Sequence, residues 1–429
     1  MKTLIIFVKK KLNSEFNRSV LKLVTGTGLA QLIAIAVSPL LTRLYTPEHF
    51  GQYGLYLSIV AIITVGVSGQ YEHALMLPKS HRKASQLLAL CLLLTFSFSI
   101  LVSLGIYIYQ LAFSHIIPLE NWIYILPISS LLTGIFNSLT SWTNRLKQYK
   151  VLSLVTVIQR LSSSLIQLLT PLLLISSVWG LIIGQITGLL ITCVSIGILA
   201  YKKKHYFIKT WNLFSIKKLA KEYKNFPQFS TVSAWLNTLS LEIPVLLLSF
   251  YFEAKEVGYY ILAKQVVQLP MSIIGQSVGK VFFQQASAVR HNTKQLSQIF
   301  ISTIKKLFMI GIIPMTILVF WGDHLFVFVF GKDWKTAGIV AQILAPWLFF
   351  FFIISPVSSM YSLLNKLKTS TLHQIFILSS RIIIILIGCI IFKNFYITMF
   401  LLSLNNLILN ILNIIYFSYT IKKKLNMLN

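Results

Sequence analysis

The chain has 429 residues, of which 56% are hydrophobic and only 11% are charged, and its mean hydropathy is +0.76. Soluble domains carry about 25% charged residues, so this composition excludes a water-soluble globular protein and indicates an integral membrane protein. The net charge of +28 does not indicate nucleic-acid binding, because the basic residues lie between apolar runs rather than on one soluble face.

Twelve apolar segments follow one another along the chain. A spanning helix needs about 20 mainly apolar residues, and a helix satisfies its own backbone groups in lipid. The expected spans are 20–42, 50–76, 85–112, 118–142, 150–174, 178–200, 227–251, 256–284, 298–322, 337–364, 369–391 and 395–420. The sequence therefore predicts an all-α integral membrane protein with twelve transmembrane helices.

The basic residues are distributed unevenly between the two sides of these spans. With the N-terminus in the cytoplasm, 29 of the 38 Lys and Arg residues fall in inner segments and five in outer loops. The positive-inside rule then predicts that both termini are cytoplasmic. The longest segment between spans, 201–226, is basic and amphipathic, which predicts a helix at the membrane surface. We expect this cytoplasmic linker to join an N-terminal lobe, 1–200, to a C-terminal lobe, 227–429, each with six helices.

One motif occurs once in each half of the chain. TNRLKQYKVLSLVTVIQR at 143–160 is followed 221 positions later by LNKLKTSTLHQIFILSSR at 364–381. Both copies begin near an Asn and a Lys, and both end in an arginine. These arginines, Arg160 and Arg381, lie roughly 15 and 18 Å from the inner ends of their helices at 1.5 Å per residue. Both are therefore expected near the middle of the membrane.

A second motif pair lies at the outer start of the second span in each half. YTPEHFGQY at 45–53 matches FEAKEVGYY at 252–260, and the alignment places Gly51 with Gly258. Six spans per half give the two halves the same orientation in the membrane. We therefore expect parallel repeats, an arrangement that alternating-access transporters use.

Two longer segments resemble a known family. The run RLYTPEHFGQYGLYLSIVAIITVGVSGQYEHALMLPKS, 43–80, resembles the outer turn and second helix of Wzx-type O-antigen and polysaccharide flippases. The run VGYYILAKQVVQLPMSIIGQSVGKVFFQQAS, 257–287, is similar to their eighth helix. These flippases belong to the multidrug/oligosaccharidyl-lipid/polysaccharide exporter superfamily. The resemblance implies two six-helix lobes around a central cavity.

The resemblance also implies a function. It predicts a flippase, not an enzyme, that moves an undecaprenyl-pyrophosphate-linked oligosaccharide from the cytoplasmic to the outer leaflet of the bacterial inner membrane. The product would be O-antigen of lipopolysaccharide, or capsule. Besides the cargo, the expected partners are membrane lipids, and a polysaccharide polymerase and chain-length machinery are further candidates.

Six charged side chains fall within the expected spans, where a charge costs roughly 2.5–3.5 kcal/mol and is kept for a partner or a cavity. They are Glu72, Arg160, Glu242, Lys264, Lys280 and Arg381. We expect the four basic residues to contact the anionic cargo in the cavity, because guanidinium and ammonium groups bind phosphate oxygens. Alternatively, the arginines tie helices to neighbouring carbonyls or pair with the glutamates. The glutamates are otherwise candidates for binding a coupling proton or sodium ion.

Enzyme chemistry has little support in the sequence. The eight histidines and three cysteines show no metal-ligand spacing, and neither a phosphate-binding glycine loop nor a G-x-S-x-G motif is present. We expect no metal and no cofactor. Two rival functions stay open, a cation-coupled multidrug exporter of the same superfamily and a membrane polysaccharide polymerase or ligase. Buried basic charge favours anionic cargo over cationic drugs. The largest expected outer loop, around 323–336, is small for a polymerase.

Overall fold

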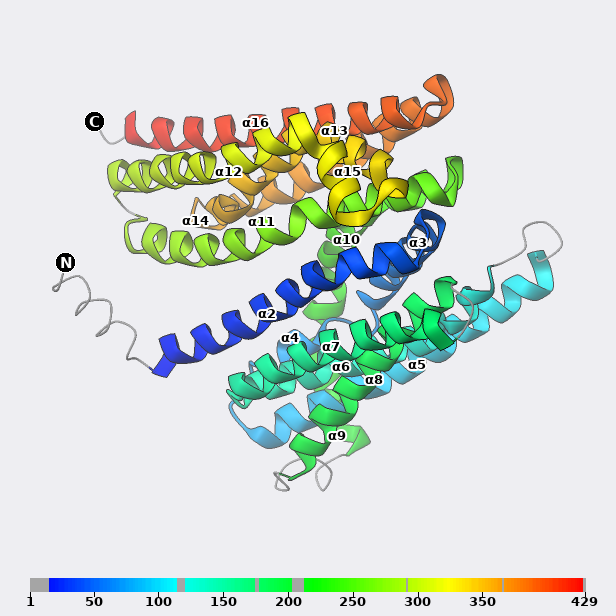
Figure 1. Ribbon diagram of the computed structural model, residues 1–429. Coiled ribbons are helices and arrows are strands. Elements are labelled where there is room, and N and C mark those ends of the chain that lie inside the picture. Colours follow the sequence, from blue (N-terminus) through cyan, green and yellow to red (C-terminus); the bar gives the residue numbers. More distant parts are fainter. Residues whose placement is uncertain are drawn as a thin grey trace. The chain divides into compact units, whose positions relative to one another are not determined.

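A computed structural model describes residues 15–113, 120–173, 177–202, 212–290, 292–364 and 366–426. Within these ranges every regular element is a helix, and eleven helices are long and apolar enough to cross a membrane (Figure 1). The first 14 residues, the last two lysines of the YKKK run in the linker, and Asn365 of the repeated motif lie outside the described residues. The chain is an all-α, multi-pass membrane protein, as its composition predicts.

The chain divides into two compact units. The first comprises the residues up to Val37 together with Tyr56–Thr238, and the second comprises Ser38–Leu55 together with Leu239–Asn429. The end of the first expected span and the start of the second therefore belong with the second unit. The lobe boundaries at 1–200, 201–226 and 227–429 stay a prediction.

The helices of the first unit pack as neighbours along the chain. They are most of α2 (Glu15–Leu44), the C-terminal half of α3 (Pro47–Thr64), α4 (Tyr71–Ala74), α5 (His81–Phe113), η1 (Asn121–Ile125), α6 (Leu126–Arg145), α7 (Tyr149–Leu173), α8 (Val178–Lys202), α9 (Leu213–Glu222), η2 (Phe226–Ser230) and the start of α10 (Thr231–Tyr251). Helix α5 packs on α6, and α8 packs on both α6 and α7. Leu139, Val155 and Ile196 form a buried contact among α6, α7 and α8.

The second expected span, 50–76, is not a continuous helix. Helix α3 ends at Thr64, a series of turns follows, and α4 begins at Tyr71. Gly69 and Gln70 both have positive φ, 60° and 59°, a backbone conformation that stops an α-helix. The side chain of Gln70 donates to the Val65 carbonyl at 2.9 Å and so satisfies one carbonyl left free by the break.

The amphipathic helix of the linker, α9, packs on protein rather than standing apart. Its apolar residues Ile216 and Leu219 join a core cluster with Tyr71, Leu75 and other buried residues of α4 and α5. The Tyr71 hydroxyl donates to the Ala220 carbonyl at 2.9 Å. The opposite face exposes lysines, and the apolar residues Ile216 and Leu219 are buried against α4 and α5 of the same unit. A location of this helix at the membrane surface stays a prediction.

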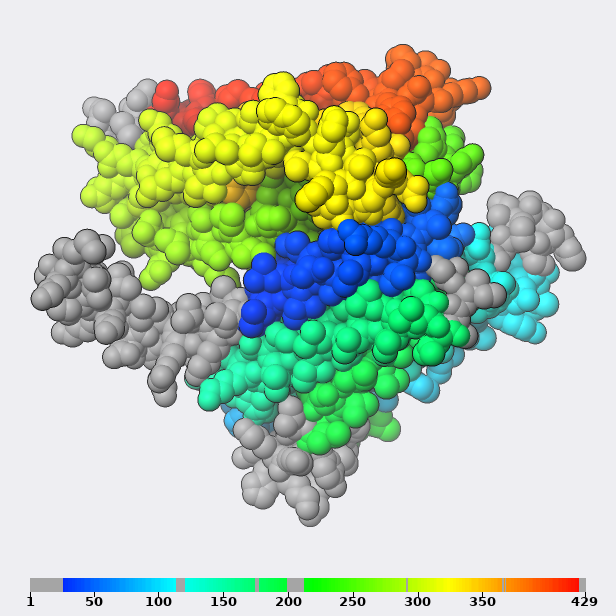
Figure 2. All heavy atoms as spheres, in the orientation of Figure 1, coloured from blue at the N-terminus to red at the C-terminus, as the bar shows by residue number. Residues whose placement is uncertain are grey.

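The second unit is built around one buried helix. Its elements after α10 are α11 (Ala254–Ala288), α12 (Thr293–Phe330), η3 (Lys332–Trp334), α13 (Lys335–Ile354), η4 (Ser355–Val357), α14 (Met360–Leu363), α15 (Leu367–Leu386), η5 (Ile387–Phe392) and α16 (Phe395–Asn426). Helix α13 contacts α11, α12 and α16 and is therefore the centre of this unit (Figure 1). Helix α12, yellow in Figure 2, covers one face, and its exposed Met309, Ile313 and Phe320 suit contact with lipid.

Two glycines allow α3 and α11 to touch within the second unit. A Cβ atom on Gly51 would lie 1.8 Å from the Ala254 carbonyl oxygen, and one on Gly258 would lie 1.9 Å from the Pro47 carbonyl oxygen. Each glycine thus faces the carbonyl four residues before the other glycine. Any side chain would overlap backbone, so this crossing requires glycine at both positions. The two glycines are those that the repeated motif aligns.

Trp334 ties the hairpin between α2 and α3 to the rest of the second unit. The indole is fully buried, and its Nε1 donates to the Thr42 carbonyl at 2.9 Å. Phe50 and Tyr259 both meet its rings edge to face, at centroid distances of 4.9 and 6.2 Å. The hairpin, through Phe50, and α11, through Tyr259, therefore both pack on the Trp334 ring.

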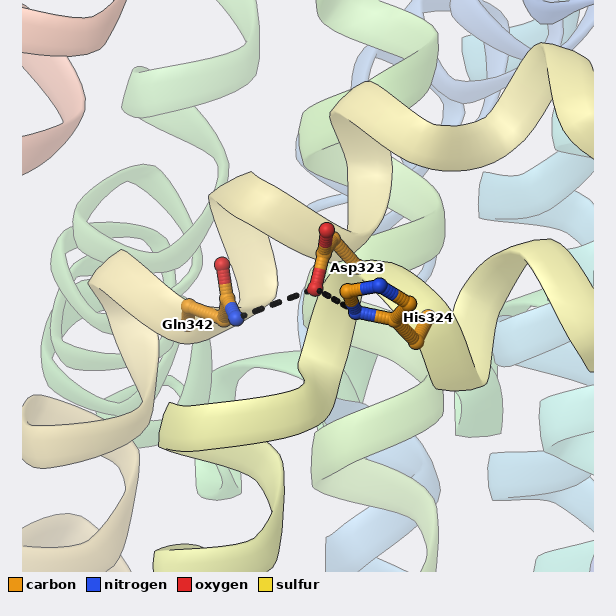
Figure 3. A network of polar contacts seen from close by, with 3 residues as sticks. All are labelled: Asp323, His324 and Gln342. Atoms are coloured by element: carbon orange, nitrogen blue, oxygen red, sulfur yellow. Dashed lines mark hydrogen bonds and ion pairs between the residues drawn. The ribbon is translucent and has the colours of Figure 1, made fainter.

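The outer loop expected around 323–336 is shorter in the structure. Helix α12 continues to Phe330, so Asp323 lies within the helix because no residue interrupts its backbone hydrogen bonds there. The Asp323 carboxylate contacts His324 Nδ1 at 2.8 Å and Gln342 Nε2 of α13 at 3.5 Å (Figure 3). A Cβ on Gly338 would lie 2.5 Å from Asp323 Cα, so α12 and α13 meet closely at this point.

Candidate functional site

Arg381 joins four helices of the second unit. It lies in α15 with 7% of its surface exposed. Its Nε donates to Asn406 Oδ1 of α16 at 2.7 Å, and its Nη1 donates to the carbonyl and, at 3.1 Å, to the hydroxyl of Ser240 in α10. The guanidinium carbon lies 5.6 Å from the ring centroid of Trp347 in α13. The arginine therefore ties helices together through charge-assisted hydrogen bonds, one of the two roles expected from the sequence.

Lys264 and Glu242 lie close to Arg381. Lys264, half-buried in α11, donates from Nζ to the Leu241 carbonyl at 3.3 Å and lies 5.9 Å from the ring centroid of Tyr260. Lys264 interacts electrostatically with both Glu242 and Arg381. Tyr260 is fully buried, and its hydroxyl has no hydrogen-bond partner among the described residues. We call Glu242, Tyr260, Lys264 and Arg381 the basic cluster.

Lys280 is not part of the basic cluster. It follows Lys264 by 16 residues on α11, a separation of roughly 24 Å along the helix. Its side chain is exposed, as are those of Gln276 and Gln284 on the same face. Lys280 thus lies on a polar surface toward the other end of α11.

Arg160 lies in the first unit, half-buried on α7. The polar residues that follow it at helical spacing, Ser163, Ser164 and Gln167, are buried. A Cβ on Gly188 of α8 would lie 1.9 Å from Ser163 Oγ, and Gln167 donates to the Leu181 carbonyl at 3.0 Å. This polar stripe is therefore the contact between α7 and α8, where small and polar residues bring membrane helices together.

Glu72 lies in the first unit beside the break after α3. It is 6% exposed, and its carboxylate accepts a hydrogen bond from the Ser68 hydroxyl. The Cys91 thiol of α5 is within its electrostatic reach. Arg145 donates to the carbonyls of Leu75 and Pro78, at 2.7 and 2.6 Å, and so holds the chain just after α4. Glu72 is thus a buried acid at an irregular stretch of backbone, which in membrane proteins is tolerated where it is enclosed by protein.

Sequence reasoning missed the neutral partners of the basic cluster. Asn406 is 2% exposed and Ser240 is 7% exposed, and both accept from Arg381. The sequence did indicate a helix contact at Asn406, because the pair Asn405–Asn406 interrupts a long apolar run. Amide side chains in membrane helices form hydrogen bonds with neighbouring helices. Ser240 carried no such signal, since serine is common in membrane helices.

The described residues hold no group of three or more His, Cys, Asp or Glu side chains that could bind a metal ion. Cys91, Cys193 and Cys389 are buried free thiols. Asp323 and His324 contact each other, and Asp323 also accepts from the Gln342 amide (Figure 3). The basic cluster brings together three of the six charged side chains that the sequence places within the expected spans, Glu242, Lys264 and Arg381.

The sequence matches one protein family and resembles one curated protein. The family model described as "Polysaccharide biosynthesis protein" matches residues 40–341. Teichuronic acid biosynthesis protein TuaB of Bacillus subtilis (strain 168) is 26% identical over 145 residues, which are 34% of this chain and only 29% of that relative.

The solved structures that resemble the chain are membrane transporters. An inward-facing multidrug resistance MATE family transporter of the MOP superfamily gives a TM-score of 0.75 at 13% identity, over 92% of this chain and 95% of that one. The lipid II flippase MurJ in an inward closed conformation gives 0.69 at 16% identity, over 93% and 87%. The fold predicted from the resemblance is confirmed.

Proposed function

We propose that this chain, which belongs to the polysaccharide biosynthesis protein family, is a flippase for an undecaprenyl-pyrophosphate-linked oligosaccharide. It would carry the cargo from the cytoplasmic to the outer leaflet of a bacterial inner membrane, with both termini in the cytoplasm. The observation that carries the proposal is the basic cluster, in which two cations and one anion lie within the membrane-spanning part of the second unit. The excess of positive charge suits a pyrophosphate.

The geometry of Arg381 suits it to hold an anion. Its Nε and Nη1 atoms are occupied by Asn406 and Ser240. Its Nη2 makes no hydrogen bond with any residue that the structure describes, so this nitrogen stays available to a phosphate oxygen. Because the other two nitrogens are fixed, the guanidinium is pre-organised and little side-chain entropy is lost on binding. Lys264 would supply the second charge as a flexible ammonium group.

Arg160 and Lys280 are proposed as further cargo contacts, and Glu72 and Glu242 as groups for ion coupling or ion pairing. Glu242 is the stronger coupling candidate, because a carboxylate beside Lys264 changes the net charge of the basic cluster when it gains a proton or a sodium ion. The drive for transport would then come from an ion gradient or the membrane potential. The two predicted lobes would alternate access around the cargo, with the polymerase and chain-length machinery acting on the product.

A cation-coupled multidrug exporter is the second candidate, and the likeness to a MATE family fold favours it. The two functions differ in the sign of the cargo. A drug exporter binds cations through buried acids, whereas the basic cluster has more basic than acidic groups.

Gene deletion in the host separates the two functions. We expect loss of a surface polysaccharide and accumulation of complete repeat units on undecaprenyl pyrophosphate, accessible only from the cytoplasmic side. Complementation with wild type should restore the polymer, and complementation with Lys264→Gln should not, at equal protein levels. Unchanged polysaccharide with increased drug sensitivity would contradict the flippase and assign the chain to drug export.

A further inference from the structure

A polar hollow lies between the C-terminal end of α11 and the first turns of α12, away from the basic cluster. Its volume is about 340 Å³. The polar residues that line it are Gln285, Gln295, Gln298, Ser302, Thr303 and Lys306. None of these residues is among the six charged residues that the sequence places within the expected spans. Gln285 follows one of those six, Lys280, by five residues on α11. The hollow is thus a second polar site in the same unit.

The lining residues on α12 form one continuous stripe. Gln295, Gln298, Ser302 and Lys306 follow one another at intervals of three or four residues, so they share a face of the helix. Gln298 and Ser302 are exposed, and the stripe extends over roughly 16 Å at 1.5 Å per residue. Gln285 faces it from α11. The hollow therefore presents amides and hydroxyls from two helices.

The lengths of the two helices place the hollow near the membrane surface. Helix α11 has 35 residues and α12 has 38, and helices of these lengths extend roughly 52 and 57 Å. The hydrocarbon core of a bilayer is only about 30 Å thick. The excess length puts the joined ends of α11 and α12 in the headgroup layer or beyond it. By the distribution of basic residues, these ends are on the predicted cytoplasmic side.

We propose that this hollow is a saccharide subsite, which holds the sugar end of the cargo at the cytoplasmic surface. The inference rests on the proposed function and adds a place for the sugars to the place for the pyrophosphate. Amides and hydroxyls both donate and accept hydrogen bonds, as sugar hydroxyls do. The volume lies at the lower end of small-molecule sites, which suits a short stretch of sugar rather than a whole repeat unit.

The chemistry of the lining favours sugar over a phospholipid headgroup. Both ligands would be available at this depth of the membrane. A headgroup phosphate calls for several cations, whereas five of the six polar lining residues are uncharged and Lys306 is the one basic residue among them. Lys306 would suit an acidic sugar.

Photocrosslinking in host membranes tests the site on the full-length chain. The probe is p-benzoylphenylalanine incorporated at Ile299, which lines the hollow. The control is the same probe at Ile301, which is 45% exposed and does not line it. We expect mass spectrometry to detect sugar-bearing adducts at position 299 but not at 301. These adducts should disappear when the first sugar-phosphate transfer to undecaprenyl phosphate is inhibited. Adducts of phospholipid alone, equal adducts at both positions, or no adduct would overturn the proposal.

A combined variant measures the contribution of the hollow to transport. We expect Gln295→Ala, Gln298→Ala and Ser302→Ala together to lower polymer export roughly tenfold or more, because several hydrogen bonds to the cargo are lost. The control variant Lys294→Ala with Ser297→Ala changes the same turns of α12 outside the hollow and should export normally. Protein level in the membrane is measured for both variants.

The two proposals fail in different ways. If deletion of the gene leaves the polysaccharide unchanged, the proposed function fails, and the saccharide subsite fails with it. If deletion blocks export but the combined variant exports like wild type, only the subsite is wrong. Export lost in the combined variant but kept in its control, with sugar adducts at Ile299, supports both.

Discussion

Arg381 ties helices together and is proposed to bind the cargo, and its mutation tests both roles. Each hydrogen bond to a charged group contributes about 1.5–3 kcal/mol, and Arg381→Ala also leaves Ser240 and Asn406 buried without their donor. We expect this variant to melt at a clearly lower temperature in detergent and to support no polymer export. Arg381→Lys keeps the charge but cannot span both acceptors, so it should be intermediate in both measurements. Wild-type stability in Arg381→Ala would contradict the helix-tying role.

Lys264 should behave differently, because it makes a single long hydrogen bond at 3.3 Å and is only half-buried. We expect Lys264→Gln to abolish or strongly reduce export while changing the free energy of unfolding by no more than about 1 kcal/mol. Lys264→Arg, which keeps the positive charge, is the matched control and should retain export. Export and melting temperature measured on the same preparations separate the two effects, and a large loss of stability in Lys264→Gln would count against a cargo role.

At the residue scale, the sequence predicted which charges enter the membrane but not what each contacts. The spacing of Ser163, Ser164 and Gln167 after Arg160 was visible in the sequence, yet a polar stripe can face a cavity or another helix. The close approach of Gly184 and Gly188 in α8 shows that the stripe faces another helix. The sequence of α7 alone does not predict that α8 is its packing partner. The depth of a side chain in the membrane follows from counting residues along its helix, whereas the direction in which it points depends on how the helices pack.

Among the elements, the crossing of α3 and α11 gives the sharpest test. We expect Gly51→Ala or Gly258→Ala to force the two helices apart, because a methyl group would overlap a backbone carbonyl oxygen. A cysteine pair introduced at Thr46 and Lys255 should then crosslink less readily than in the parent, with reduced export. Gly28→Ala and Gly105→Ala are the controls, since a Cβ at either position meets nothing within 4 Å. Unchanged crosslinking in the Gly51→Ala and Gly258→Ala variants would mean that the crossing tolerates a side chain.

The element boundaries followed the hydropathy closely, with two exceptions. Length and apolar content predicted twelve continuous helices. The structure interrupts the second span between Thr64 and Tyr71, and it interrupts the span 337–364 between Ile354 and Met360, where a short 3₁₀ helix and a turn separate α13 from α14. The segment VGVSGQ contains two glycines, but glycine is tolerated in membrane helices and does not by itself predict a break. The break depends on tertiary partners such as Pro227, which lies 3.5 Å from a Cβ built on Gly69.

At the scale of the whole molecule, the distribution of Lys and Arg predicts the orientation of the chain in the membrane. Fluorescent protein fused after the C-terminus should fold and fluoresce, and alkaline phosphatase fused there should be inactive, because both termini are expected in the cytoplasm. Alkaline phosphatase inserted at Lys332, in an expected outer loop, is the matched control and should be active. Active phosphatase at the C-terminus would reverse the predicted orientation and remove the saccharide subsite from the cytoplasmic side.

The contact of Gly51 with Gly258 has the form that a twofold axis produces. In an isologous interface, residue i of one copy meets residue j of the other, and j meets i. Here Gly51 faces Ala254 while Gly258 faces Pro47, and these four residues are paired by the repeat. An ancestral six-helix chain that paired with a parallel copy of itself would have made this contact between identical glycines. On this origin, gene fusion would have freed each glycine to change alone, but the backbone overlap still penalises either change. The single chain would then keep the constraint of a former homodimer.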